Sequence, residues 1–265
     1  GDYARAEQQL TVALALARTT EQQDLVISTL VRLANLAEYQ AHYPVAQQYC
    51  AEALALSHTT TNRIGESRAL NKLGSLYQRL GDFAQAKSCW ERALTLIEQS
   101  GIAANKAELL TNLGVICDNL GNYAAAQRYY QVALRLSRTN GVRHTEAEVL
   151  GNLGISADYV GDYAAALTYS QSCLQLLQQL GISGRMPIVL VNLGLHAHHL
   201  GDHKAAELYG QRALALSQQG GNRHLQSYAW TILGHAATAL EKFADAAAAY
   251  TEAITLARAL AIPLM

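Results

Sequence analysis

The sequence repeats itself every forty residues along almost its whole length. One column of this repeat holds a leucine in every copy, and a glycine follows the leucine in most copies. The leucines are Leu33, Leu73, Leu113, Leu153, Leu193 and Leu233, and the glycines are Gly74, Gly114, Gly154, Gly194 and Gly234. A fixed period of this length is the signature of an array in which each copy is one small unit packed on its neighbours. We therefore expect one continuous array, residues 1–265.

Each copy has the pattern of two helices joined by a tight turn. The first helix carries Leu70, Leu73, Gly74 and Tyr77, which is the spacing of a core-facing stripe. A Gly-Asp or Gly-Asn turn follows, in which the glycine ends one helix and the Asp or Asn can cap the next. Glycine inside a helix costs about 1 kcal/mol relative to alanine, so its recurrence beside the leucine predicts that another helix approaches closely there.

Alignment of the forty-residue copies divides the chain into a half repeat and six full repeats. The predicted boundaries are 1–22, 23–62, 63–102, 103–142, 143–182, 183–222 and 223–265. This division gives about thirteen antiparallel helices. Because the first residues match the turn in the middle of a repeat, we expect the chain to be a piece of a longer protein. Apolar residues follow the last helix and could fold back on it: Leu260, Ile262, Leu264 and Met265.

Composition narrows the class of protein. Half of the residues are apolar, and only three prolines and two phenylalanines are present, which disfavours a β-rich or disordered chain. The net charge of −1 provides no basic surface for nucleic acid. No apolar run reaches the roughly 20 residues that span a membrane. The four cysteines form no CxxC pair, so we expect neither disulfides nor a zinc site, and a reducing, cytoplasmic setting.

These columns resemble the tetratricopeptide repeat (TPR). The resemblance rests on the leucine-glycine pair and on the alanine twelve residues after the glycine, as in Gly74 and Ala86, and it covers essentially the whole chain. It implies an all-α, right-handed α-α superhelix whose first helices line a concave groove. The forty-residue form with Asn-Leu-Gly is similar to arrays in kinesin light chain, in the mitotic adaptor LGN and in bacterial ATPase regulators such as the maltose-operon activator.

Three asparagines precede the leucine in successive repeats: Asn112, Asn152 and Asn192. An amide offers a donor and an acceptor, which suits it to bind the backbone of an extended peptide. Similarly placed asparagines bind peptide in arrays like kinesin light chain. The alternative is that they bond neighbouring helices and only help the repeats to stack. Arg32, Lys72 and Ile232 occupy the same column elsewhere, so the ladder is incomplete.

Further candidates for ligand contact lie in other columns expected to face the groove, and their character changes along the array. The early candidates are Arg68, Lys72 and Arg79, the middle ones are Glu108, Asp118, Glu148 and Asp158, and the late ones are Leu195, His198, Tyr228 and His235. The acidic middle could contact a basic stretch of a ligand. An ordinary solvated helix face would show similar charges.

Catalysis and metal binding have little support in the sequence. His199 and His203 are four residues apart, but the Gly201-Asp202 turn separates them, so they are not expected to share a helix face as metal ligands. His203 stands in an aromatic column and is expected to pack. No GxxxxGK[ST], GxSxG or HExxH motif is present. We expect no enzyme activity, no cofactor and no metal.

The function favoured by these patterns is a scaffold that binds a peptide or protein segment, as the sensor or docking part of a larger intracellular signalling or transcription-regulatory protein. Two alternatives stay open. The chain could be a spacer that associates end to end through its first helix and apolar tail, or it could sense a small molecule through the mixed polar and apolar late groove.

Overall fold

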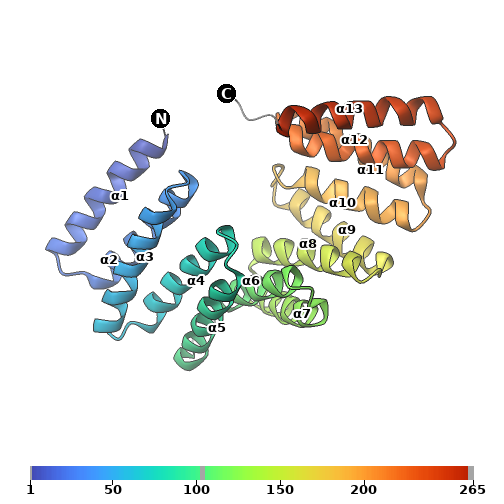
Figure 1. The fold of residues 1–265 in the computed structure, drawn as a ribbon. Helices are drawn as coiled ribbons and strands as arrows, with labels where there is room; N and C mark the ends of the chain where they lie inside the picture. Colours follow the sequence, from blue (N-terminus) through green and yellow to red (C-terminus); the bar gives the residue numbers. More distant parts are fainter. Residues whose placement is uncertain (1, 102–104, 262–265) are drawn as a thin grey trace. The chain divides into compact units, whose positions relative to one another are not determined.

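The computed structural model describes residues 2–101 and 105–261, which form thirteen α-helices and no strand (Figure 1). The helices are α1 (Asp2–Thr19), α2 (Gln23–Tyr39), α3 (Tyr43–Thr59), α4 (Arg63–Arg79), α5 (Phe83–Ser100), α6 (Lys106–Asn119), α7 (Tyr123–Thr139), α8 (Arg143–Tyr159), α9 (Tyr163–Gln179), α10 (Met186–His199), α11 (His203–Gln219), α12 (Arg223–Ala239) and α13 (Phe243–Ala261). The all-α class and the helix number are confirmed. The predicted boundary at 102–103 and the apolar Ile262, Leu264 and Met265 lie outside the described residues.

The helices group into two compact units, residues 1–122 with α1–α6 and residues 123–265 with α7–α13. Inside the first unit, α2 packs on α3, α4 packs on α5, and α2 also contacts α4. Inside the second, α8, α10 and α12 each pack on the helix that follows them, α10 contacts α12, and α8 contacts α10. We call α2, α4, α6, α8, α10 and α12 the first helices and α3, α5, α7, α9, α11 and α13 the second helices. The repeat boundaries proposed from the sequence stay a prediction.

The turns between paired helices have the predicted geometry. Gly81, Gly161 and Gly201 each have φ of +80°, a left-handed conformation that glycine adopts without strain. The aspartates that follow Gly161 and Gly201 cap the second helices. Asp162 accepts a hydrogen bond from the backbone N–H of Ala165 at 3.1 Å, and Asp202 accepts one from that of Ala205 at 3.0 Å.

The glycines inside the first helices mark close helix contacts, as predicted. A Cβ added at Gly74 would lie 2.7 Å from the indole of Trp90 on α5, and one at Gly234 would lie 2.6 Å from the ring of Tyr250 on α13. At Gly194 the near neighbour is Ile232, 2.7 Å away on the next first helix. The missing side chain is therefore what lets these helices pack so closely.

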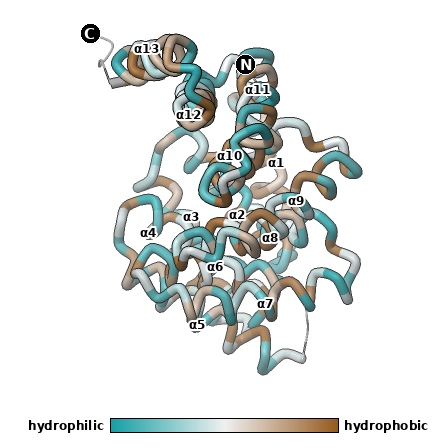
Figure 2. The backbone as a smooth tube through the Cα atoms, turned by 90° about the vertical axis from the view of Figure 1, so that its right-hand side faces the viewer, coloured by the Kyte–Doolittle hydropathy of each residue, from teal (hydrophilic) through white to brown (hydrophobic). Residues whose placement is uncertain are grey.

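Small residues line the second helices where they meet the first. Ala46, Ala86, Ala126, Ala166 and Ala206 stand at equivalent positions and are fully buried. Figure 2 shows apolar positions interspersed with polar ones along the helices, the pattern of a helix buried on one side. No helix in the described part of the chain is both long and apolar enough to cross a membrane.

Candidate functional site

The first helices of the second unit expose one stripe of side chains each. On α8, Asn152 is half-buried, and Ile155 and Tyr159 are exposed, at spacings of three and four residues that place them on one side of the helix. Leu153 and Ala157, on the other side, are buried. The stripes of α8, α10 and α12 include predicted binding residues, and we call them together the stripe face: Glu148, Asn152, Ile155, Tyr159, Ile188, Asn192, Leu195, His199, Tyr228 and His235.

The two asparagines of the stripe face are free to bind. Asn152 and Asn192 are half-buried, and neither side chain makes a hydrogen bond to another described residue. Each amide can therefore offer its N–H and its oxygen to a ligand. Their predicted role in binding peptide stays a prediction, but the structure leaves their hydrogen-bonding groups unused.

Asn112, in the first unit, has a different environment. Its Nδ2 donates to Oδ1 of Asn71 on α4 at 3.0 Å. The amide thus links two neighbouring first helices, which is the stacking role that was the alternative in the sequence. Asn112 shares a sequence column with Asn152 and Asn192 but not their free state.

Asn71 is the centre of a polar cluster that sequence reasoning missed. Its Oδ1 accepts from the indole N–H of Trp90 at 2.9 Å, and its Nδ2 donates to Oε1 of Glu108 at 2.8 Å. Glu108, predicted to contact a basic ligand, is therefore already held by this chain. Trp90 was the available signal, because a fully buried indole N–H needs an acceptor nearby.

Two of the three predicted basic residues point to one buried carboxylate. Glu38 on α2, whose side chain is 8% exposed, pairs with the ammonium of Lys72 and the guanidinium of Arg79. Burial, and to a smaller extent Arg79, lowers the pKa of Lys72 to about 8. Arg68 is exposed and borders a pocket of about 190 Å³ at the start of α4. Lys72 and Arg79 thus join α2 to α4, and Arg68 stays open to solvent.

The predicted acidic residues are spread over both units. Glu148 on α8 lies 4.0 Å from Arg185, a loose pair at the surface. Asp158, also on α8, accepts a hydrogen bond from Nδ1 of His196 on α10 at 3.1 Å. Asp118 is half-buried near the end of α6 in the first unit. In the second unit, Glu148 therefore has the carboxylate best placed to meet a basic side chain of a ligand.

Two of the four late residues, His198 and His235, belong to a histidine cluster. The ring of His198 on α10 lies 5.2 Å from that of His235 on α12 and 5.2 Å from that of His203 at the start of α11. Tyr228 is 46% exposed on the stripe face and packs edge-on against His224. Leu195, three residues before His198 on α10, is half-buried. Within the described ranges, no three His, Cys, Asp or Glu side chains are arranged to hold a metal ion.

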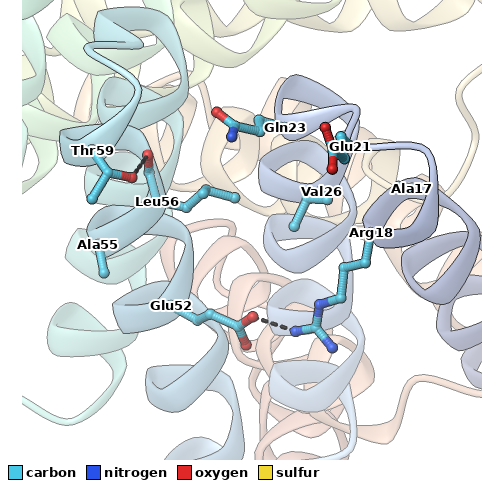
Figure 3. Close-up of a pocket in the computed structure, with 9 residues that line it drawn as sticks. All are labelled: Ala17, Arg18, Glu21, Gln23, Val26, Glu52, Ala55, Leu56 and Thr59. Carbon is cyan, nitrogen blue, oxygen red and sulfur yellow. Dashed lines mark hydrogen bonds and ion pairs between the residues drawn. The ribbon is translucent and has the colours of Figure 1, made fainter.

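The pocket of about 670 Å³ in the first unit was not predicted (Figure 3). Helices α1, α2 and α3 form its walls. Val26 and Leu56 supply apolar surface, and Arg18 on α1 pairs with Glu52 on α3 across the opening. None of the predicted binding residues lines it. Its polar side chains are exposed to solvent, so its shape alone selects no ligand.

Comparison with known proteins confirms the resemblance seen in the sequence. A family model described as tetratricopeptide repeat matches residues 65–139 and 185–259, together more than half of the chain. Comparison with curated proteins finds no match. Among solved structures, BtubC (BKLC) from P. vanneervenii is similar over 91% of this chain and 91% of its own, with 24% identity and a TM-score of 0.66.

Two further solved structures share the fold. A signal transduction ATPase with numerous domains and a tetratricopeptide repeat sensor, from Pyrococcus horikoshii, matches 90% of this chain with 14% identity and a TM-score of 0.75, over 38% of its own length. A Rap protein complexed with competence and sporulation factor matches 97% of this chain and 74% of its own, with 18% identity and a TM-score of 0.67. These likenesses confirm the all-α superhelical fold class.

Proposed function

Because the chain belongs to the tetratricopeptide repeat family, we propose that it is a non-catalytic scaffold that binds an extended segment of another protein on the stripe face of its second unit. The observation that carries the proposal is that Asn152 and Asn192, on successive first helices, have no hydrogen-bonding partner in the part of the chain described. A half-buried amide that has no partner within the chain can form hydrogen bonds with a ligand without first breaking one.

The spacing of the helices fits a peptide in extended conformation. Packed helices lie about 8–10 Å apart, and an extended chain advances about 3.3 Å per residue. Asn152 and Asn192 would therefore bind backbone groups about three residues apart in the ligand. Three or four residues from these asparagines on the same helices, Ile155, Ile188 and Leu195 offer apolar contact to the ligand's side chains. We infer a ligand with apolar side chains, because Glu148 is the only Asp, Glu, Lys or Arg in the stripe face.

The parent protein is proposed to be a signalling or transcription-regulatory protein in which this array is the sensor or docking part. The similarity to a tetratricopeptide repeat sensor supports this role, as does the similarity to a Rap protein complexed with a factor. The four cysteines are buried and form no disulfide, which supports a reducing compartment such as the cytoplasm.

A matched set of alanine variants tests the binding site. A displayed random-peptide library is selected against the wild-type chain, and the affinity of an enriched peptide is then measured by calorimetry. With two hydrogen bonds of about 1 kcal/mol each removed, N152A/N192A should bind about thirtyfold more weakly. N112A is the control, because Asn112 is held by Asn71, and it should keep wild-type affinity. Equal affinity of the double variant and the wild type would refute the site.

Self-association is a second candidate function, favoured by exposed apolar residues on the first and last helices. On α1, Val12 and Leu16 are 63% and 61% exposed, and on α13, Phe243 and Ile254 are 68% and 51% exposed. Such residues could bind a second copy of the chain. Light scattering over a hundredfold range of concentration decides the matter. A mass that stays that of one chain, 28.6 kDa, excludes this candidate.

A further inference from the structure

Three histidines from three consecutive helices meet where α10 packs against α12. His198 (α10) contacts both His203 (α11) and His235 (α12), each with 5.2 Å between ring centroids. In each of the three rings Nδ1 is buried and has no hydrogen-bond partner in the part of the chain described. Protonation would place a charged N–H at such a nitrogen, where neither water nor an acceptor stabilises it. The cluster is therefore built for neutral rings.

No carboxylate among the described residues is positioned to compensate charge in this cluster. The acidic residues of the α12–α13 turn and of α13, Glu241, Asp245 and Glu252, form no ion pair or hydrogen bond with the three rings. Three further acidic groups on or beside these helices have other partners. Asp158 of α8 is bonded to His196, Asp202 accepts the backbone N–H of Ala205, and Glu207 of α11 binds Lys242 at 2.9 Å. The other ionisable groups facing the cluster include His199, whose ring lies 5.8 Å from that of His198. Tyr163 of α9 is stacked on His199, and Tyr250 of α13 lies beside His235.

The contact between the neighbouring first helices α8 and α10 differs, because it contains a carboxylate. At the contact of α8 with α10, Asp158 occupies the repeat position that His198 occupies in α10, and it binds His196. An imidazole beside a carboxylate gains an ion pair when it is protonated. Burial lowers the pKa of His196, but Asp158 opposes that shift. Acid therefore weakens the contact of α8 with α10 less than that of α10 with α12, where it sets like charges against each other. Burial and the surrounding histidines also lower the pKa of His198, and burial lowers that of His235.

We propose that the His198, His203 and His235 cluster is an acid-operated release point, at which protonation frees the last helix pair, α12 and α13, from α10 and α11. The release requires no ligand, so it stands apart from the proposed binding function. It would also carry Tyr228 and His235 away from the other first helices, which breaks up the late end of the stripe face. The second unit would then lose that part of its surface in a mildly acidic environment.

Hydrogen exchange followed by mass spectrometry tests the release in the full chain, with EDTA present to remove adventitious metal. Rates are corrected for the pH dependence of intrinsic exchange, and opening of α12 and α13 is compared with that of α8 and α9 from pH 7.5 to 5.5. Each imidazole that binds a proton only on opening contributes up to about a tenfold increase in the opening constant per pH unit. We expect an increase of at least tenfold for α12 and α13 and a smaller increase for α8 and α9.

The control variant takes its replacements from the same repeat positions elsewhere in the chain. Gln78, Tyr163 and Leu195 stand where His198, His203 and His235 stand, so H198Q/H203Y/H235L uses side chains that this fold already accommodates. It should abolish the acid response and keep wild-type protection at pH 7.5. H144Q, at an exposed histidine of α8, should keep the response.

Two results would overturn the proposal. One is an acid response of α12 and α13 no greater than that of α8 and α9, and the other is a response that persists in the triple variant. Should that variant fail to fold, NMR titration of the wild-type imidazole carbons decides instead. Depressed pKa values for His198 and His235 are expected, and ordinary values of about 6.5 for both would overturn the proposal.

Discussion

Asp158 on α8 and His196 on α10 form a hydrogen bond, with 3.1 Å between Oδ1 and Nδ1. The side chain of His196 is 2% exposed, and its other nitrogen, Nε2, has no partner in the described part of the chain. Among the described residues, this bond is the only side-chain hydrogen bond of His196. It joins α8 and α10, two successive first helices of the second unit. The bond therefore links the two helices that carry Asn152 and Asn192.

Asp158→Ala should destabilise the second unit by about 1–3 kcal/mol, because it leaves a buried donor of His196 unsatisfied. Asp158→Asn should cost less than half as much, since the amide oxygen can still accept the bond. Urea unfolding at pH 7.5, followed by circular dichroism, measures both. Equal losses in the two variants would show that the negative charge, and not the hydrogen bond, is what matters.

Stability should fall as the pH drops below about 6.5. Burial lowers the pKa of His196, His198 and His235 from the ordinary value of 6.5. Between the lowered and the ordinary values the unfolded chain binds more protons than the folded one, so stability is complete above about pH 6.5 and declines below it. At pH 5.5 carboxylates are still ionised, since their ordinary pKa is about 4. A urea midpoint at pH 5.5 equal to or above that at pH 7.5 would contradict this.

Two glycine-to-alanine changes should shift the free energy of unfolding in opposite directions. At Gly74 a new Cβ would meet the indole of Trp90, which is fully buried and bonded to Asn71, so Gly74→Ala should cost about 1–3 kcal/mol through overpacking. At Gly151 the nearest atom is Sγ of Cys173 at 3.6 Å, an ordinary contact. Gly151→Ala should therefore stabilise by about 0.5–1 kcal/mol through helix propensity. Thermal unfolding measures the change in melting temperature of both variants. A change in the same direction for both would refute the argument.

Leucine truncation should cost more inside the array than at its first helix. Leu153, on α8, is 2% exposed, and Leu153→Ala should lose about 2–5 kcal/mol. Leu10, on α1, is only half-buried, so Leu10→Ala should lose clearly less. Denaturant titration with hydrogen exchange locates each loss in its own unit. Equal losses would mean that α1 is packed as firmly as α8.

The fold was readable from the sequence because its determinants are local and recur. The leucine column predicts the buried stripe, Gly161 with Asp162 predicts the turn and its cap, and Gly74 predicts a close helix contact. Each depends on backbone geometry or on a neighbour within the same repeat, which the repeat spacing places reliably. The helix count and the family follow from these columns alone.

What the sequence could not decide is which side chains already have a partner. Asn112 and Asn152 occupy the same column, yet the structure shows Asn112 bonded to Asn71 and leaves Asn152 free. Likewise Lys72 pairs with the buried Glu38, and His198 lies against His203 and His235. These partners come from other repeats, 34 to 41 residues away for the two bonded pairs. Repetition by itself determined the helices, the turns and the buried columns, because they depend on local spacing. Only the tertiary structure decided which polar groups remain available, because that depends on the side chains that differ from one repeat to the next.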